Sequence, residues 1–81
     1  MLFAKIKLMN EEIHAGHLIR EVLKEKGHTV SWFAQKVNRE RSTIYTIFEN
    51  PHIHTSLLLQ VSIILEYDFF QYFSDYFIHK Q

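Results

Sequence analysis

Residues 29–49, TVSWFAQKVNRERSTIYTIFE, decide the fold, because they have the pattern of two short helices joined by a tight turn. Ala34 is a small residue of the kind needed where two helices cross closely. The apolar positions around it recur at helical intervals of three and four: Phe33, Val37, Ile44, Ile47 and Phe48. The stretch therefore predicts a helix, a reversal of the chain within a few residues, and a second helix over 41–49.

Polar residues mark the start and the turn of this stretch. The Thr29 hydroxyl can cap the first helix by accepting from the backbone N–H of Ser31 or Trp32, and Ser31 is a rival cap. Asn38 falls where the turn needs a positive φ, which Asn tolerates best after Gly. Asn50, just after the second helix, is again a residue that can end a helix in the left-handed conformation.

The spacing of Ala34, Asn38, Ile44 and Ile47 resembles the motif of the Cro and lambda-repressor-like, or XRE-type, helix-turn-helix family. That motif has a small residue, Gly four positions later, and apolar residues ten and thirteen positions after the small one. Asn38 departs from it by replacing the Gly. The resemblance covers roughly residues 14–73 and implies a compact five-helix, lambda-repressor-like DNA-binding domain.

The flanking sequence predicts three further helices, which makes the expected fold all-α. One helix runs from about 14 to 26 and stops at Gly27. After a loop at 50–54, Thr55 caps a helix that is apolar nearly all round, and Asp68 caps a last, aromatic helix.

We expect three segments along the chain. Residues 1–12 form an N-terminal arm or a flexible segment, because Ala4, Ile6 and Leu8 alternate with lysines as in an extended strand. Residues 13–78 form the helix-turn-helix domain, and 79–81 form a tail.

Length and composition narrow the class of protein. With 81 residues we expect one domain and no separate small-molecule effector domain. The chain has no cysteine, its longest apolar run is too short to span a bilayer, and no signal peptide is convincing. These features predict a cytoplasmic protein without membrane contact.

The formal net charge is zero, but the charge is unevenly distributed. Residues 1–41 carry a net +3 and residues 42–81 a net −3. Lys36, Arg39 and Arg41 cluster around the turn, where a DNA reader of this kind meets the phosphate backbone. The alternative is that these charges belong to ordinary solvated faces.

The candidate DNA contacts follow from the outer side of the second helix. By resemblance, Arg41, Ser42 and Thr46 match the base-reading positions of the family, and Tyr45 lies beside them. The candidates for phosphate contact are Thr29, Trp32, Lys36, Arg39 and Thr43. For each of these the alternative is a solvated helix surface, and for Trp32 it is a packed side chain.

The last helix carries six aromatics within nine residues, more than one edge of a small bundle can hide: Phe69, Phe70, Tyr72, Phe73, Tyr76 and Phe77. They cover the core from outside or form a homodimer interface. We expect a homodimer, and a two-fold dimer would set two recognition helices about 34 Å apart.

The sequence shows no motif of a catalytic, metal-binding or cofactor-binding site, so we expect no enzyme activity, metal or cofactor. The expected function is that of a sequence-specific transcriptional regulator of double-stranded DNA, a repressor of the prophage or antitoxin type. The alternative is a protein-interaction module that uses its aromatic last helix and hardly touches DNA.

Overall fold

The computed structural model describes residues 13–80, and these residues form five helices. The helices are α2 (Ala15–Glu25), α3 (Val30–Val37), α4 (Arg41–Glu49), α5 (Thr55–Leu65) and α6 (Phe69–Lys80). The described part of the chain holds no strand, so the predicted all-α, five-helix architecture is confirmed. The predicted arm over residues 1–12 lies outside the described residues.

Most helix ends lie where the residue types predict them. Gly27 ends α2 with a φ of 78°, and Asn38 ends α3 in the left-handed conformation, with φ 63° and ψ 49°. Asp68 caps α6, because its Oδ1 accepts from the backbone N–H groups of Phe70 and Gln71 at 3.0 and 3.1 Å. The boundaries of α4 agree with the predicted range of 41–49.

One predicted helix cap is wrong, and one helix ends at the predicted residue in a different conformation. Thr55 is the first residue of α5 rather than its cap; the N-cap is His54, whose side chain makes no capping hydrogen bond. Asn50 is the C-cap of α4, as predicted, but its backbone is extended, with φ −96° and ψ 116°, instead of left-handed. Pro51 disfavours helical backbone at the residue before it, and the Asn50 side chain accepts from the His52 N–H at 3.0 Å.

Glu66 ends α5 in the left-handed conformation, with φ 52°, which its residue type does not predict. A side chain with a Cβ pays a steric penalty in this conformation. The carbonyl of Glu66 accepts from the ammonium of Lys26 at 3.2 Å, which ties the end of α5 to the end of α2.

One core joins all five helices. Its fully buried large side chains come from every helix: Phe33, Phe48, Phe69, Ile19, Ile44, Leu65, Val22 and Val61. Phe33 and Phe48 face each other with parallel rings 6.4 Å apart, so the two helices of the predicted motif share one aromatic contact.

The backbone at the start of α2 lies close against the backbone at the end of α4. The N–H groups of Ala15 and Gly16 donate to the carbonyls of Pro51 and Asn50, at 3.2 and 3.0 Å. A Cβ on Gly16 would overlap backbone oxygens of α4 and the following loop, that of Asn50 at 2.7 Å. We call the contact of Ala15 and Gly16 with Asn50 and Pro51 the α2–α4 joint.

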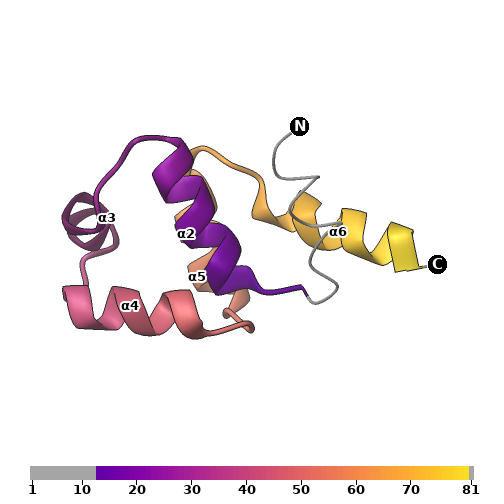
Figure 1. Cartoon of the computed structure of the whole chain (residues 1–81), viewed down its shortest axis with the longest axis horizontal. Helices are drawn as coiled ribbons and strands as arrows, with labels where there is room; N and C mark the ends of the chain where they lie inside the picture. Colours follow the sequence, from indigo (N-terminus) through magenta and orange to yellow (C-terminus); the bar gives the residue numbers. More distant parts are fainter. Residues whose placement is uncertain (1–12, 81) are drawn as a thin grey trace.

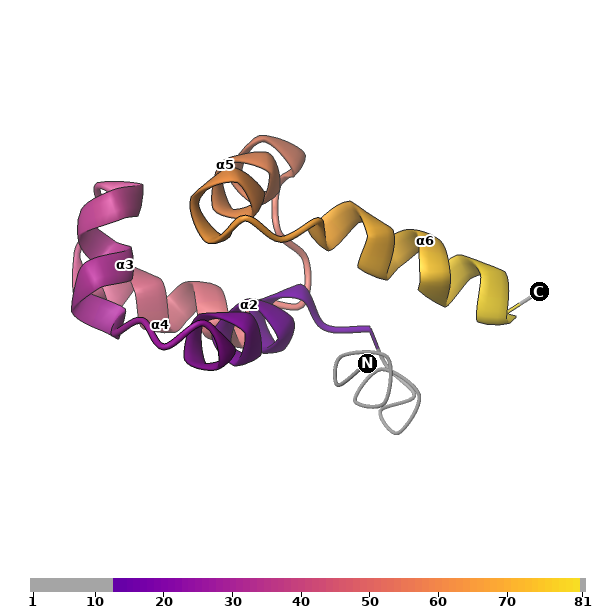
Figure 2. The same cartoon turned by 90° about the horizontal axis from the view of Figure 1, so that it is seen from above.

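The two views in Figures 1 and 2 show α2 to α5 gathered into one body, from which α6 projects at one end. α5 packs against α2 and α3, and α6 packs mainly against α5. Phe69 and Tyr72 root α6 in the core, whereas Phe77 and Ile78 near its far end are 64 % and 60 % exposed.

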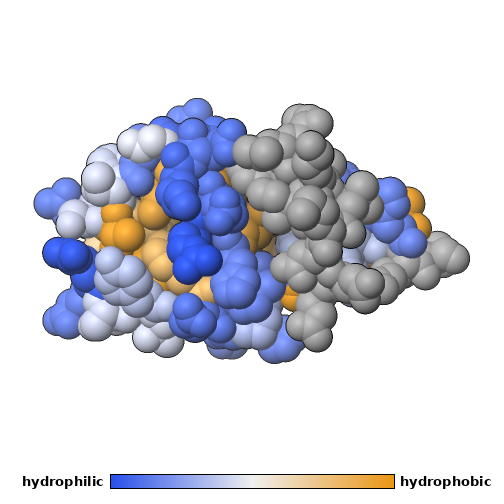
Figure 3. All heavy atoms as spheres, viewed as in Figure 1, coloured by the Kyte–Doolittle hydropathy of each residue, from blue (hydrophilic) through white to orange (hydrophobic). Residues whose placement is uncertain are grey.

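Polar side chains cover much of the face seen in Figure 3, with apolar atoms visible where α2, α3 and α4 meet. No helix within residues 13–80 combines the length and the apolar character needed to cross a membrane.

Candidate nucleic-acid interface

The start of α3 is fixed by a side-chain cap. The Thr29 hydroxyl accepts from the Trp32 N–H at 3.0 Å, so Thr29 rather than Ser31 is the cap. The Phe33 N–H donates to the Thr29 carbonyl at 3.1 Å. These bonds leave the N–H groups of Val30 and Ser31 as the free donors that point out of the first turn.

Trp32 is half-buried and held between two neighbours. The His28 ring stacks on it with centroids 3.6 Å apart, and the Lys36 ammonium lies 5.8 Å from the ring centroid. This arrangement fixes the plane of the indole beside an exposed cation.

The turn after α3 takes its shape from Asn38. The N–H groups of Asn38 and Arg39 donate to the carbonyls of Gln35 and Ala34, at 3.1 and 2.9 Å, which closes the end of α3. Ala34 is buried at the helix crossing, as its small size predicts. The chain is thereby redirected into α4 within three residues, and the Arg39 side chain is exposed.

α4 presents its four predicted base-reading residues to solvent: Arg41, Ser42, Tyr45 and Thr46. The Tyr45 ring packs edge-on against Phe48, with centroids 6.0 Å apart, and is still 49 % exposed. The Thr46 hydroxyl donates to the Ser42 carbonyl at 3.2 Å. Its hydrogen is therefore engaged within the helix.

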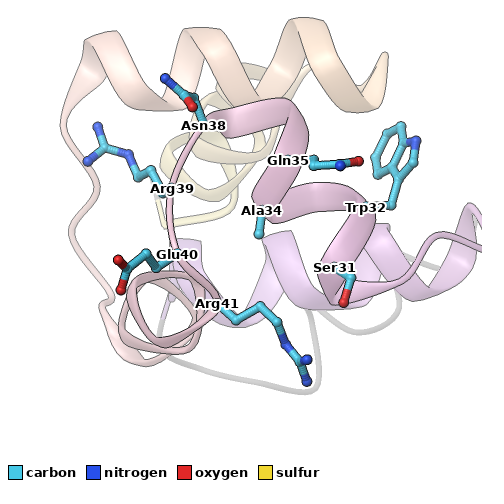
Figure 4. A pocket seen from close by; sticks show the side chains of 8 residues that line it. All are labelled: Ser31, Trp32, Ala34, Gln35, Asn38, Arg39, Glu40 and Arg41. Carbon is cyan, nitrogen blue, oxygen red and sulfur yellow. The ribbon is translucent and has the colours of Figure 1, made fainter.

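Between α3 and the start of α4 lies an open hollow, shown in Figure 4. Ser31 and Arg41 lie together at one edge, Trp32 and Gln35 extend side by side at another, and Arg39 and Glu40 lie on the side of the turn. Ala34 forms the floor, where its small side chain leaves room.

The predicted contact residues divide into two groups. Trp32, Arg39 and Arg41 line the hollow. Thr29, Lys36, Ser42, Tyr45 and Thr46 lie on the same two helices or their caps, are exposed, and do not line it. Thr43 is half-buried.

Sequence reasoning missed three residues of the hollow: Ser31 as a contact residue, Gln35 and Glu40. Ser31 and Gln35 are four apart and both exposed, so the outer face of α3 carries the signal that could have found them. Glu40 precedes α4, makes no capping hydrogen bond and is exposed; it lies on the same side of the hollow as Arg39, away from the end of the Arg41 side chain.

The formal charges of the exposed side chains on α3, the turn and α4 nearly cancel. Lys36, Arg39 and Arg41 are opposed by the exposed carboxylates of Glu40 and of Glu49 at the end of α4. A phosphate backbone would be attracted by three cations and repelled by two anions of this surface, so its long-range attraction would be small.

The six aromatics of α6 take two different roles. Phe69 and Tyr72 are buried in the core of the single chain, at 0 % and 7 % exposure, and have no surface to offer a second copy. Phe70 and Phe77 are exposed, while Phe73 and Tyr76 are half-buried. Any interface on α6 therefore uses the second set only.

Histidines do not gather into a metal centre in the described chain. Across residues 13–79 the structure brings together no three His, Cys, Asp or Glu side chains that could hold a metal ion.

Comparison with models of protein families, with curated proteins and with solved structures finds no match for this chain. The function proposed below therefore rests on the chain's own residues and geometry.

Proposed function

We propose that this protein is a sequence-specific regulator that binds double-stranded DNA and acts as a repressor by occupying its operator. The main support for this proposal is the pair of helices α3 and α4, which are joined through a left-handed Asn38. The exposed face of α4 is polar along its length. A helix of this kind, set against a capped first helix, has the layout of a helix-turn-helix reader.

In this proposal α4 enters the major groove and reads base edges. Arg41 forks onto O6 and N7 of a guanine, and Ser42 donates to or accepts from either kind of base pair. Because the Thr46 hydroxyl donates to the Ser42 carbonyl, its methyl group is the part left to touch a thymine methyl. Tyr45 contributes its exposed ring and hydroxyl at the next turn.

The start of α3 fixes the register by holding the phosphate backbone. The N–H groups of Val30 and Ser31 remain free at the positive end of the helix dipole, where an oxyanion is stabilised. Thr29, Trp32 and Lys36 flank this position, with Arg39 in the turn and Thr43 on the edge of α4. Such contacts position the protein without carrying sequence information.

We propose that the active form is a homodimer joined through the outer part of α6. Phe70 and Phe77, seven residues apart on one face, are exposed, and an isolated helix does not need aromatic side chains there. A two-fold dimer doubles the three cations per copy and lets two α4 helices read half-sites about 34 Å apart.

A gel-shift titration with a selected duplex tests DNA reading. We expect Arg41→Ala to relax the base preference, whereas Lys36→Ala weakens binding to all sequences alike. The control is Lys24→Ala, which removes an exposed cation on α2 that is not among the proposed contacts, and should change neither quantity. Absence of binding to any duplex at low salt by the folded protein would refute the proposal.

Sedimentation tests the dimer. Phe77→Ser should shift the protein toward monomer, and Ile63→Ser, which removes an equally exposed apolar residue from α5, should not. A wild-type protein that stays monomeric at high concentration contradicts the proposed interface.

The exposed aromatics of α6 also favour a second candidate function, that of a protein-interaction module. It predicts a folded protein that binds no duplex and loses partner binding with Phe77→Ser. For the DNA-binding function we propose a cytoplasmic location, where the operator is accessible.

A further inference from the structure

His14 lies where three helices meet. It is the N-cap of α2, and the two residues after it, Ala15 and Gly16, form the α2–α4 joint. Its backbone N–H donates to the hydroxyl of Tyr72 on α6 at 3.4 Å. The residue thus links the start of α2 to the end of α4 and to the root of α6.

The side chain of His14 caps α2 through a ring nitrogen. Nδ1 accepts from the backbone N–H of His17 at 3.0 Å, and the two imidazoles stack with centroids 3.6 Å apart and planes 8° from parallel. The N–H groups of Ala15 and Gly16 donate across the α2–α4 joint, so every backbone N–H group in the first turn of α2 has an acceptor. A His cap is less common than Ser, Thr, Asp or Asn, and it alone among these binds a proton near neutral pH.

Protonation of the His14 ring breaks the hydrogen bond that its Nδ1 accepts from the His17 N–H. Nδ1 can accept a hydrogen bond only while it carries a lone pair, and protonation turns it into a donor that faces the His17 N–H. The added charge also lies at the positive end of the α2 dipole and against a second imidazole.

The groups that face His14 from each helix set the direction of its titration. Burial, and then the neighbouring His17, lower the pKa of His14; contacts with backbone groups of His14 and Glu49, and the Glu49 carboxylate, oppose this without reversing it. On the α6 side, burial raises the pKa of Tyr72, so its hydroxyl remains neutral.

We propose that His14 makes the α2–α4 joint an acid-sensitive latch: uptake of one proton releases the first turn of α2 from α4 and α6. Because the joint holds the end of α4, the latch also lowers operator affinity in mild acid, a consequence that rests on the proposed function.

Stability depends on pH because the folded and unfolded chains bind the His14 proton with different affinity. The native state holds His14 neutral more strongly than the unfolded chain, whose histidines titrate near about pH 6.5. The stabilisation is therefore complete above that pH and is lost as the pH falls through it toward the lowered native value.

Thermal unfolding between pH 7.5 and 5.5 tests the latch with two variants. His14→Asn keeps a capping acceptor that does not titrate, and His79→Asn removes an exposed histidine on α6 as the matched control. We expect wild type and His79→Asn to lose about 4 °C more of Tm over this range than His14→Asn. Equal losses in all three proteins would overturn the proposal.

A proton NMR titration tests the latch in the wild-type protein alone, so it does not depend on whether a variant folds. The His14 ring should titrate below about pH 6.5, the ordinary value for a histidine, and the His17 amide signal should move with the His14 titration. A His14 ring that titrates at or above the ordinary histidine value of about 6.5, or a His17 amide that does not respond, contradicts the latch.

DNA binding separates this inference from the proposed function. If the protein binds no duplex at any pH, the DNA-reading function fails, while the stability and NMR measurements still decide the latch. If it binds, wild-type affinity should fall between pH 7.5 and 5.5 at least threefold more than that of His14→Asn. Equal pH dependence would refute the regulatory part.

Discussion

At the scale of the residue, Gly16 occupies a position where the structure leaves no room for a side chain. A helix interior ordinarily favours Ala over Gly by about 1 kcal/mol. Here a Cβ would meet backbone oxygens of Ile47, Phe48 and Asn50, which cannot move aside as a flexible side chain would. We therefore expect Gly16→Ala to lower the free energy of unfolding by about 1–3 kcal/mol in urea titration, against the helix propensity.

The second glycine provides the comparison. Gly27 has open space around the position of a Cβ and a φ of 78°, so Gly27→Ala adds only the left-handed backbone penalty, about 1 kcal/mol. A larger loss for Gly27→Ala than for Gly16→Ala would show that the α2–α4 joint is not tightly packed.

Ser62 on α5 presents the opposite case. Its hydroxyl oxygen is buried and has no hydrogen-bond partner among the described residues. Ser62→Ala removes the unsatisfied group, and we expect it to raise the free energy of unfolding by about 1 kcal/mol. Ser56→Ala, at an exposed site on the same helix, reports the change in helix propensity alone. If the two substitutions have equal effects, the Ser62 hydroxyl is not destabilising.

At the scale of the element, two helices end in a left-handed residue that is not Gly. Asn tolerates this conformation well and Glu poorly, so Glu66→Gly should stabilise the fold by about 1 kcal/mol and Asn38→Gly by clearly less. The bond from Lys26 goes to the Glu66 carbonyl and survives the substitution. Urea midpoints of the two variants check the order; the reverse order would contradict this explanation.

The elements also show how far the sequence alone could lead. The range of α4 and its outward residues are predictable because Ile44, Ile47 and Phe48 define one inner face, and whatever lies opposite must be exposed. The left-handed Asn38 is predictable from the local chemistry of Asn.

Other features depend on contacts between distant segments. The extended backbone of Asn50 is predictable from Pro51, the residue after it, but the hydrogen bond that its carbonyl accepts from Gly16 depends on a segment more than thirty residues away. The hollow that gathers Ser31 and Gln35 with Arg41 exists only once α3 and α4 cross. The division of the aromatics of α6 into core and surface likewise follows from where α5 lies.

At the scale of the whole molecule, the near balance of charge predicts a modest salt dependence. Three cations per copy on the candidate surface give a slope of log Kobs against log salt of about −2.7 for one copy and about −5.4 for a dimer. Fluorescence anisotropy titrations with duplex DNA at salt concentrations between about 50 and 200 mM measure this slope. A slope near zero would exclude phosphate contacts by Lys36, Arg39 and Arg41.

The projection of α6 from the body has a mechanical consequence. Its 12 residues span about 18 Å, and they are rooted at one end by Phe69 and Tyr72. A tilt of about 10° at the root moves the far end by about 3 Å, close to the rise of one base pair, about 3.4 Å. In a pair of chains joined at these far ends, α6 would act as a lever arm whose inclination sets which spacing of half-sites the two reading helices can span.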